Sequence, residues 1–202
     1  LDLMGGIADY SGALVLQWPI REATWAIVQP NESREIQIAS VHLDSPDFVR
    51  QATAQLSSLN ENNEPISYED ARQLFKSNPA DSWMAYPAGV FVALMRERNA
   101  EFGHGAKILL VSDVPEGKGV SSSAALEVST MTAVAAAFDI ALTAEDIGAL
   151  SQKVENEVVG APCGIMDQMG SSCSQMGALM ALRCRPAERL GNVALPEGAQ
   201  IW

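Results

Sequence analysis

Cysteine and histidine are scarce in this chain. Its 202 residues contain three cysteines and two histidines. Cys163, Cys173 and Cys184 form no Cys-x-x-Cys motif, and neither histidine lies near them in sequence. A disulfide scaffold and a Cys/His zinc site are therefore excluded, and the isolated thiols are typical of a reduced, cytoplasmic protein.

Basic residues are also few. Thirteen Lys and Arg stand against 25 Asp and Glu, which gives a net charge of −12, and no run of basic residues occurs. Because nucleic acids are bound through clustered Lys and Arg, we expect no nucleic-acid partner. The acidic charge also argues against binding to an anionic membrane, although a local cationic pocket for a nucleotide remains compatible with it.

The chain has no signal-peptide pattern and no membrane-span pattern. Its first residues include Asp2 and Asp9 and no basic stretch. The longest apolar stretch, residues 120–142, contains Glu127 and Asp139 and is rich in Ala, Ser and Thr, which predicts a buried helix. With 48% hydrophobic residues, the chain can bury the core of one or two domains.

Hydrophobic periodicity predicts a mixture of strands and helices. Residues 1–4 are typical of the middle of a strand, and residues 13–20, 23–29 and 34–40 predict three strands of a meander. Further strands are expected at 105–112 and 178–184. Residues 60–65 are expected to form a polar loop, and the Pro-Glu-Gly sequence at 196–198 a turn.

Five helices are expected. Residues 69–76 and 82–98 have helical patterns, and Pro87 should lie near an end or a kink of the second. A long helix starts at Ser122. Thr143 and Asp146 have the spacing of a capping box for a helix that Gly160 ends near residue 159, and a short helix follows Gly164.

Residues 115–125 read Pro-Glu-Gly-Lys-Gly-Val-Ser-Ser-Ser-Ala-Ala and are the most informative stretch. Gly117 and Gly119 allow sharp backbone bends that bring N–H groups close to an anion, and the following helix directs its positive dipole end to the same place. The hydroxyls of the three serines can donate to phosphate or bind magnesium. The stretch therefore predicts a phosphate-binding loop.

Other phosphate loops do not fit this stretch. A Walker A loop requires Ser or Thr after Gly-Lys, whereas glycine follows Lys118 here. A dinucleotide fingerprint requires a third glycine where Ser122 stands. A Gly/Ser-rich loop that only caps a helix remains the structural alternative.

Two later carboxylates complete a possible phosphoryl-transfer site. Ser123 and Glu155 could share a magnesium ion, and Asp167 could orient and deprotonate an attacking hydroxyl. Each residue also has a structural explanation. Glu155 could lie on a solvated helix face with Glu157, Asp167 could cap its own helix, and Asp9 could form an Asx turn.

Three ordered motifs resemble those of the GHMP small-molecule kinases. They are residues 3–12 (Leu-Met-Gly-Gly-Ile-Ala-Asp-Tyr-Ser-Gly), residues 115–125, and residues 155–168 (Glu-Asn-Glu-Val-Val-Gly-Ala-Pro-Cys-Gly-Ile-Met-Asp-Gln). The galactokinase and L-arabinokinase branch is the most similar. The resemblance spans residues 1–184 and implies an α+β fold of the ribosomal-protein-S5-domain-2-like type, a mixed sheet with helices packed on it, and Mg-ATP as phosphoryl donor.

The resemblance also implies roles for particular residues. Asp167 matches the catalytic aspartate, Gly164 a backbone contact to the sugar, and Asp9 a carboxylate that binds sugar hydroxyls. Ser123 and Glu155 match the magnesium ligands, and Trp83 matches an aromatic near the adenine, although it could equally be a core residue. The serine loop matches the part of the family's site that binds the triphosphate. Its matching residues are Gly117, Gly119, Val120, Ser121, Ser122, Ser123 and Ala124.

One departure from the galactokinase pattern bears on the sugar. Galactokinases usually have Glu-His where this chain has Gly6-Ile7, and that carboxylate reaches toward the C6 hydroxyl of galactose. L-Arabinopyranose shares the ring stereochemistry of galactose but has no C6 hydroxymethyl group, so Gly6 and Ile7 suit the pentose. We therefore expect phosphorylation of the anomeric hydroxyl of L-arabinose, with galactokinase activity or a catalytically silent sugar and ATP sensor as alternatives.

Two parts of the family pattern are missing. The family's catalytic arginine precedes the position of Leu1, and its third, Gly-rich motif belongs to a carboxy-terminal domain beyond Trp202. We therefore expect residues 1–202 to be one ATP-binding amino-terminal domain, truncated at both ends, that requires the carboxy-terminal domain of the same polypeptide and has little activity alone.

Overall fold

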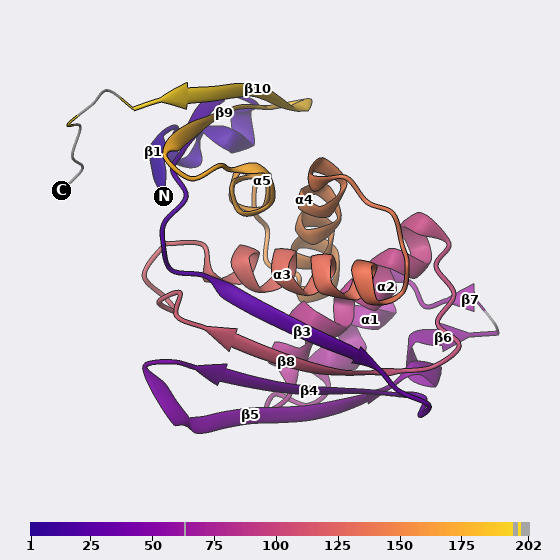
Figure 1. The fold of residues 1–202 in the computed structure, drawn as a ribbon. Helices are drawn as coiled ribbons and strands as arrows, with labels where there is room; N and C mark the ends of the chain where they lie inside the picture. The colour runs from indigo at the N-terminus through magenta and orange to yellow at the C-terminus, as the bar shows by residue number, and fades with distance from the viewer. Residues whose placement is uncertain (63, 196–197, 199–202) are drawn as a thin grey trace.

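The computed structural model describes residues 1–62, 64–195 and 198. Within this part, a layer of helices separates two four-stranded sheets (Figure 1). The larger sheet has the order β3-β8-β4-β5, formed by Thr24–Pro30, Ala106–Ser112, Glu35–His42 and Ser45–Gln55. The smaller sheet has the order β1-β2-β9-β10, formed by Asp2–Met4, Leu14–Gln17, Ala178–Cys184 and Ala187–Ala194.

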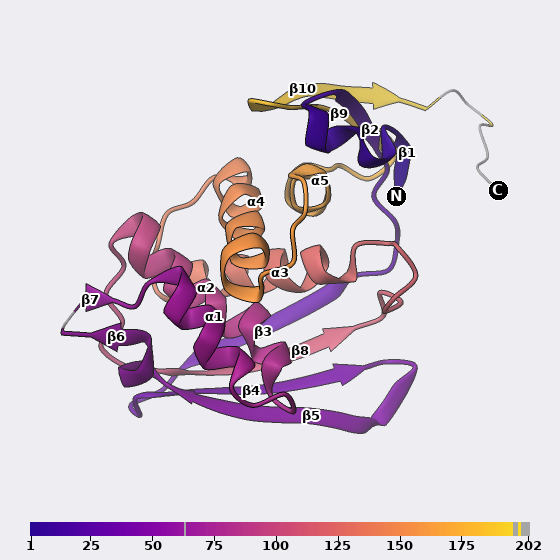
Figure 2. The same cartoon turned by 180° about the vertical axis from the view of Figure 1, so that it is seen from behind.

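The larger sheet is mixed. Strand β8 runs antiparallel to β3 and parallel to β4, and β4 runs antiparallel to β5. Because side chains alternate between the two faces of a strand, Ile36, Ile38 and Ile108 share one face, and all three are buried. The helices cover only this face, as both views show (Figures 1 and 2).

The helices are α1 (Tyr68–Lys76), α2 (Ala85–Arg98), α3 (Ser122–Ala137), α4 (Ala144–Lys153) and α5 (Met166–Cys173). Short 3₁₀ helices occupy η1 (Gly6–Ser11), η2 (Leu56–Leu59) and η3 (Ser82–Met84). A π-helical turn, η4 (Val154–Val159), extends α4. In the described part of the chain, no helix is both long and apolar enough to cross a membrane.

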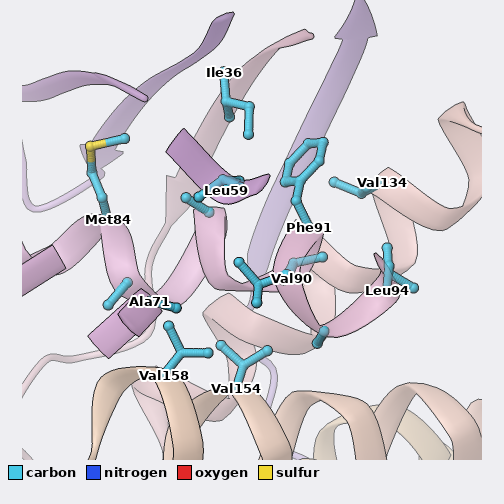
Figure 3. Packing of buried hydrophobic residues seen from close by; sticks show 14 of the residues in the cluster. Ile36, Leu59, Ala71, Met84, Val90, Phe91, Leu94, Val134, Val154 and Val158 are labelled. Atoms are coloured by element: carbon cyan, nitrogen blue, oxygen red, sulfur yellow. The ribbon is translucent and has the colours of Figure 1, made fainter. Parts of the chain in front are cut away.

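The main core lies between the larger sheet and the helices. Helix α2 is buried around most of its circumference because it packs against the sheet on one side and η4 on the other, as Figure 3 shows for Phe91 and Val90. The Phe91 ring lies 4.7 Å from that of Phe102 and 6.1 Å from that of Phe138 between centroids. A smaller cluster, which includes Val15, Met169 and Leu182, joins α5 to the smaller sheet.

Most of the predicted elements are present. The α+β fold class is confirmed, and strand 178–184 has the predicted bounds. Pro87 lies in the first turn of α2, and the predicted capping box at Thr143 and Asp146 forms. The predicted helix ending near residue 159 is α4 continued by η4, and it stops at Gly160 in a left-handed conformation.

The predicted meander is wrong. Strand β2 belongs to the smaller sheet, and β8 lies between β3 and β4. The predicted loop at 60–65 contains a short strand pair, β6 (Asn60–Glu61) and β7 (Glu64–Pro65), and strands β5 and β10 were not predicted. Strand pairing depends on contacts far apart in sequence, so local patterns could not define it. Of the turn predicted at 196–198, residues 196 and 197 lie outside the described residues.

The aromatic packing yields a stability prediction. Truncating Phe91, which is fully buried, to Ala removes contacts to two other rings and leaves a cavity, so Phe91→Ala should lower the free energy of unfolding by about 3–5 kcal/mol. Phe48 on β5 is 64% exposed, so Phe48→Ala should change the free energy of unfolding by about 0.5 kcal/mol or less. Chemical denaturation of both variants measures the difference, and equal losses would contradict this description of the core.

Candidate active site

The phosphate-loop prediction falls on an exposed turn between β8 and α3. Gly117 and Gly119 have φ values of 68° and 70°, in the left-handed region that glycine adopts without strain. Ser121 also has a positive φ, of 61°, and makes no side-chain cap to α3. The first backbone N–H groups of α3 are therefore available to an anion, at the end of the helix where its dipole favours negative charge.

Asp167 lies in the first turn of α5 and faces this loop. Its side chain lines an open cleft of about 880 Å³, and Val120 and Ser121 line the same cleft. Partial burial raises the pKa of the Asp167 carboxyl, the hydroxyl of Ser121 opposes that rise, and the charge of Asp9 adds to it. Segments near residues 9, 121 and 167 thus converge on one carboxyl group.

Asp9 is held against the segment that precedes α5. Its side chain is 6% exposed, within η1. A Cβ on Gly164 would overlap the Asp9 carboxylate, so the two can be this close only because residue 164 is glycine. The Tyr10 hydroxyl also donates to the Pro162 carbonyl at 3.2 Å. The first and third sequence motifs are therefore in direct contact.

Glu155 is buried in the π-helical turn η4, where only 7% of the residue is exposed. Glu127 of α3 is fully buried beside it. Burial, and then the charge of Glu155, raise the pKa of Glu127 well above its usual range. The side-chain amide of Gln168 donates to both, at 2.5 Å to Glu155 Oε2 and 3.4 Å to Glu127 Oε2.

The two buried glutamates fit a magnesium ion. Oε1 of Glu127 has no hydrogen-bond partner, and none of the ion pairs in the described residues involves either glutamate. Ser123 lies one helical turn before Glu127 on the same face of α3. The described residues contain no cluster of three or more His, Cys, Asp or Glu side chains suited to a metal. Magnesium commonly uses one or two carboxylates together with substrate phosphates.

Two structural explanations considered for the carboxylates are wrong. Glu155 is not on a solvated helix face, whereas the nearby Glu157 is exposed and pairs with Arg72. Asp167 does not cap α5, because the N-cap position is Ile165. The third explanation was an Asx turn at Asp9. Asp9 lies inside η1 and is buried, and an Asx turn does not require such burial.

Three further predicted residues are Trp83, Gly6 and Ile7. Trp83 packs against the main core and does not line the cleft, as expected for a core residue. Ile7 is 85% exposed beside Gly6, which has a φ of 51°. Sequence reasoning missed Glu127 and Gln168 as parts of the site. The sequence offered one signal, the charged Glu127 within the apolar pattern of α3. That signal indicated only that this helix does not span a membrane.

The geometry defines a class: an α+β domain in which a Gly/Ser loop at a helix N-terminus faces a partly buried aspartate, and in which the glutamine after that aspartate donates to two buried glutamates. The family described as GHMP kinases N terminal domain matches residues 85–175, which include the loop, both glutamates and the aspartate. Residues 85–175 therefore carry a GHMP kinase N-terminal domain, and the whole chain is similar to a kinase of that family.

The chain is similar in sequence to an L-arabinokinase and to a galactokinase. It is 45% identical to the L-arabinokinase of Arabidopsis thaliana, over all of this chain and 22% of that protein. It is 41% identical to the galactokinase of Actinobacillus succinogenes over 55% of this chain and 29% of that protein. The chain therefore spans less than a third of the length of these curated relatives.

Solved structures show the same fold. The galactokinase of Lactococcus lactis, complexed with galactose, superimposes with a TM-score of 0.76 and 21% identity, covering 96% of this chain and 45% of that one. The mevalonate kinase of Methanococcus jannaschii gives a TM-score of 0.64 and 19% identity, covering 95% of this chain and 53% of that one.

The contact between Asp9 and Gly164 can be tested by adding one methyl group. Gly164→Ala places a Cβ where the Asp9 carboxylate now lies, so the loop or η1 must move, and the free energy of unfolding should fall by about 1–3 kcal/mol. Gly103→Ala is the matched control, because its Cβ would have no neighbour within 4 Å. Urea denaturation of both variants provides the measurement. A Gly164→Ala protein as stable as the control would refute the contact.

Proposed function

We propose that this chain is the ATP-binding amino-terminal domain of an ATP-dependent sugar-1-kinase whose substrate is L-arabinose. The product would be β-L-arabinose 1-phosphate. The observation that carries the proposal is the common cleft of Asp167 and the serine loop, because a phosphoryl-transfer site must bring the nucleotide phosphates and the acceptor hydroxyl together.

In the proposed reaction, the anomeric hydroxyl oxygen of the sugar forms a bond to the γ-phosphorus of ATP. The bond from that phosphorus to the bridging β,γ-oxygen breaks, and ADP leaves with the electron pair. Asp167 orients the hydroxyl and accepts its proton or passes it to water. Its raised pKa suits this role, because a carboxylate with a higher pKa is a stronger proton acceptor.

The loop and the glutamates would bind the charged part of the nucleotide. Backbone N–H groups around Ser121 and Ser122 would donate to phosphate oxygens, and Gly117 and Gly119 give the phosphates access to the backbone. Ser123 and Glu155 would hold Mg²⁺, with Glu127 next to them. When bound, the ion would supply positive charge that stabilises the transferring phosphoryl group.

The sugar would lie between Asp9, Gly164 and Asp167. Asp9 is buried against Gly164 and could accept hydrogen bonds from sugar hydroxyls with its free lone pairs. Gly6 and Ile7 provide no carboxylate at the position where galactokinases reach toward C6. A pentose that lacks C6 loses nothing there, and the 45% identity to an L-arabinokinase supports the same substrate.

The intact enzyme would need more than these residues. A carboxy-terminal domain of the same polypeptide would close the cleft and supply the third family motif, and an arginine from the segment before Leu1 would join the site. The domain alone should therefore have little turnover.

The proposal predicts the behaviour of an intact protein that contains this chain. It should phosphorylate L-arabinose with a higher kcat/KM than D-galactose, because no group on Gly6 or Ile7 can bind the C6 hydroxyl of galactose.

Asp167→Asn should lower kcat by at least about 100-fold, the scale of a lost general base, while ATP affinity changes little. Coupled ADP-release assays and nucleotide titration measure both effects.

Each part of the proposal has its own contradicting result. A clear preference for galactose would favour the galactokinase alternative and reject the role given to Gly6 and Ile7. No turnover of either sugar by the intact protein, with sugar and ATP both bound, would favour the silent sensor. Full turnover by the Asp167→Asn variant would reject its assigned role.

A further inference from the structure

Gln168 follows Asp167 directly on α5 but faces a different environment. Asp167 lines the cleft, whereas the Gln168 side chain is fully buried. Consecutive residues on a helix point about 100° apart, so one turn of α5 presents a carboxylate to the cleft and an amide to the protein interior.

The Gln168 amide lies between polar groups from three other segments. Its nitrogen donates to Glu155 Oε2 at 2.5 Å in η4, to Glu127 Oε2 at 3.4 Å in α3, and to Cys163 Sγ at 3.6 Å in the connecting loop. The Cys163 thiol also donates to Glu155 Oε2 at 3.6 Å. A neutral amide is well suited to this position, because it donates to two carboxyl groups without adding a charge.

A buried amide that only filled space would be expected to satisfy both of its ends. In the described residues, Gln168 Oε1 has no hydrogen-bond partner. The hydrogen bonds of its side-chain nitrogen therefore determine the position of this side chain. Leaving a buried acceptor unpaired is costly, and the two carboxyl contacts must offset that cost.

We infer that Gln168 is a positioning residue for the divalent cation of the proposed kinase. It fixes the direction of the Glu155 carboxylate and ties that carboxylate to the turn of α5 that carries Asp167. The distance between the cation site and the proton acceptor is then set by one rigid turn of helix. This inference rests on the proposed function, because it assigns Glu155 to the cation.

Partners that orient metal-binding residues commonly contribute 10–100-fold to metal affinity. Gln168→Met keeps a similar volume but removes the donor, so Glu155 loses its orienting contact. We expect this variant to bind Mn²⁺, in the presence of saturating ADP, about 10–100-fold more weakly than the unmodified protein. Affinity for ADP measured without divalent cations should change less than about 2-fold, because the amide does not face the loop.

Gln152→Met is the matched control. Gln152 of α4 lies near the same loop, but its amide donates to the Cys163 carbonyl at 3.3 Å and not to a glutamate. Its Mn²⁺ affinity should stay within about 2-fold of the unmodified protein, because no carboxylate loses a donor. The free Mn²⁺ signal in electron paramagnetic resonance reports binding directly in an intact protein that contains this chain, without reliance on turnover.

Two results would overturn the positioning role. One is equal Mn²⁺ affinity in Gln168→Met and the unmodified protein, and the other is an equal loss of metal-free ADP binding. If Gln168→Met melts below the assay temperature, Gln168→Asn carries the test, because its shorter amide cannot reach Glu155 as closely and should also weaken Mn²⁺ binding. If the unmodified protein binds ADP but no Mn²⁺, the proposed cation site fails, and this inference fails with it.

Discussion

The position of α3 between the larger sheet and the helices α4 and α5 is the constraint on which the site depends. Its first turn forms the end of the serine loop, and its second turn carries Glu127. Packing on both sides requires small or apolar residues, which Ala124 and Met131 supply. Because α3 cannot shift without disturbing the core, the loop and the glutamate pair hold their places relative to Asp167.

The site concentrates negative charge in a partly buried region. Asp9, Glu127 and Glu155 are all buried, and Asp167 is partly so. Burying carboxylates without cationic partners is costly, and here donation from the Gln168 amide reduces that cost. Such an arrangement favours a ligand that brings its own cation, as a magnesium nucleotide does.

Much of this arrangement could be predicted from sequence, because local rules determine it. The glycines of the loop, the capping box of α4 and the alternation in β9 each depend on neighbouring residues alone. The strand order, β5 and β10 depend on distant pairing, which the local pattern does not contain. Likewise, nothing near Glu127 or Gln168 in sequence indicates that they meet, because α3 and α5 are brought together only by the fold.

The central claim is that segments around Asp9, Ser121 and Asp167 converge on one carboxyl group, and an NMR titration of the Asp167 carboxyl tests it most directly. The account predicts a pKa above the usual aspartate range, a lower pKa in Asp9→Asn, which removes a neighbouring charge, and a higher pKa in Ser121→Ala, which removes a donor to the charged form. An Asp167 pKa that neither substitution moves would contradict the account.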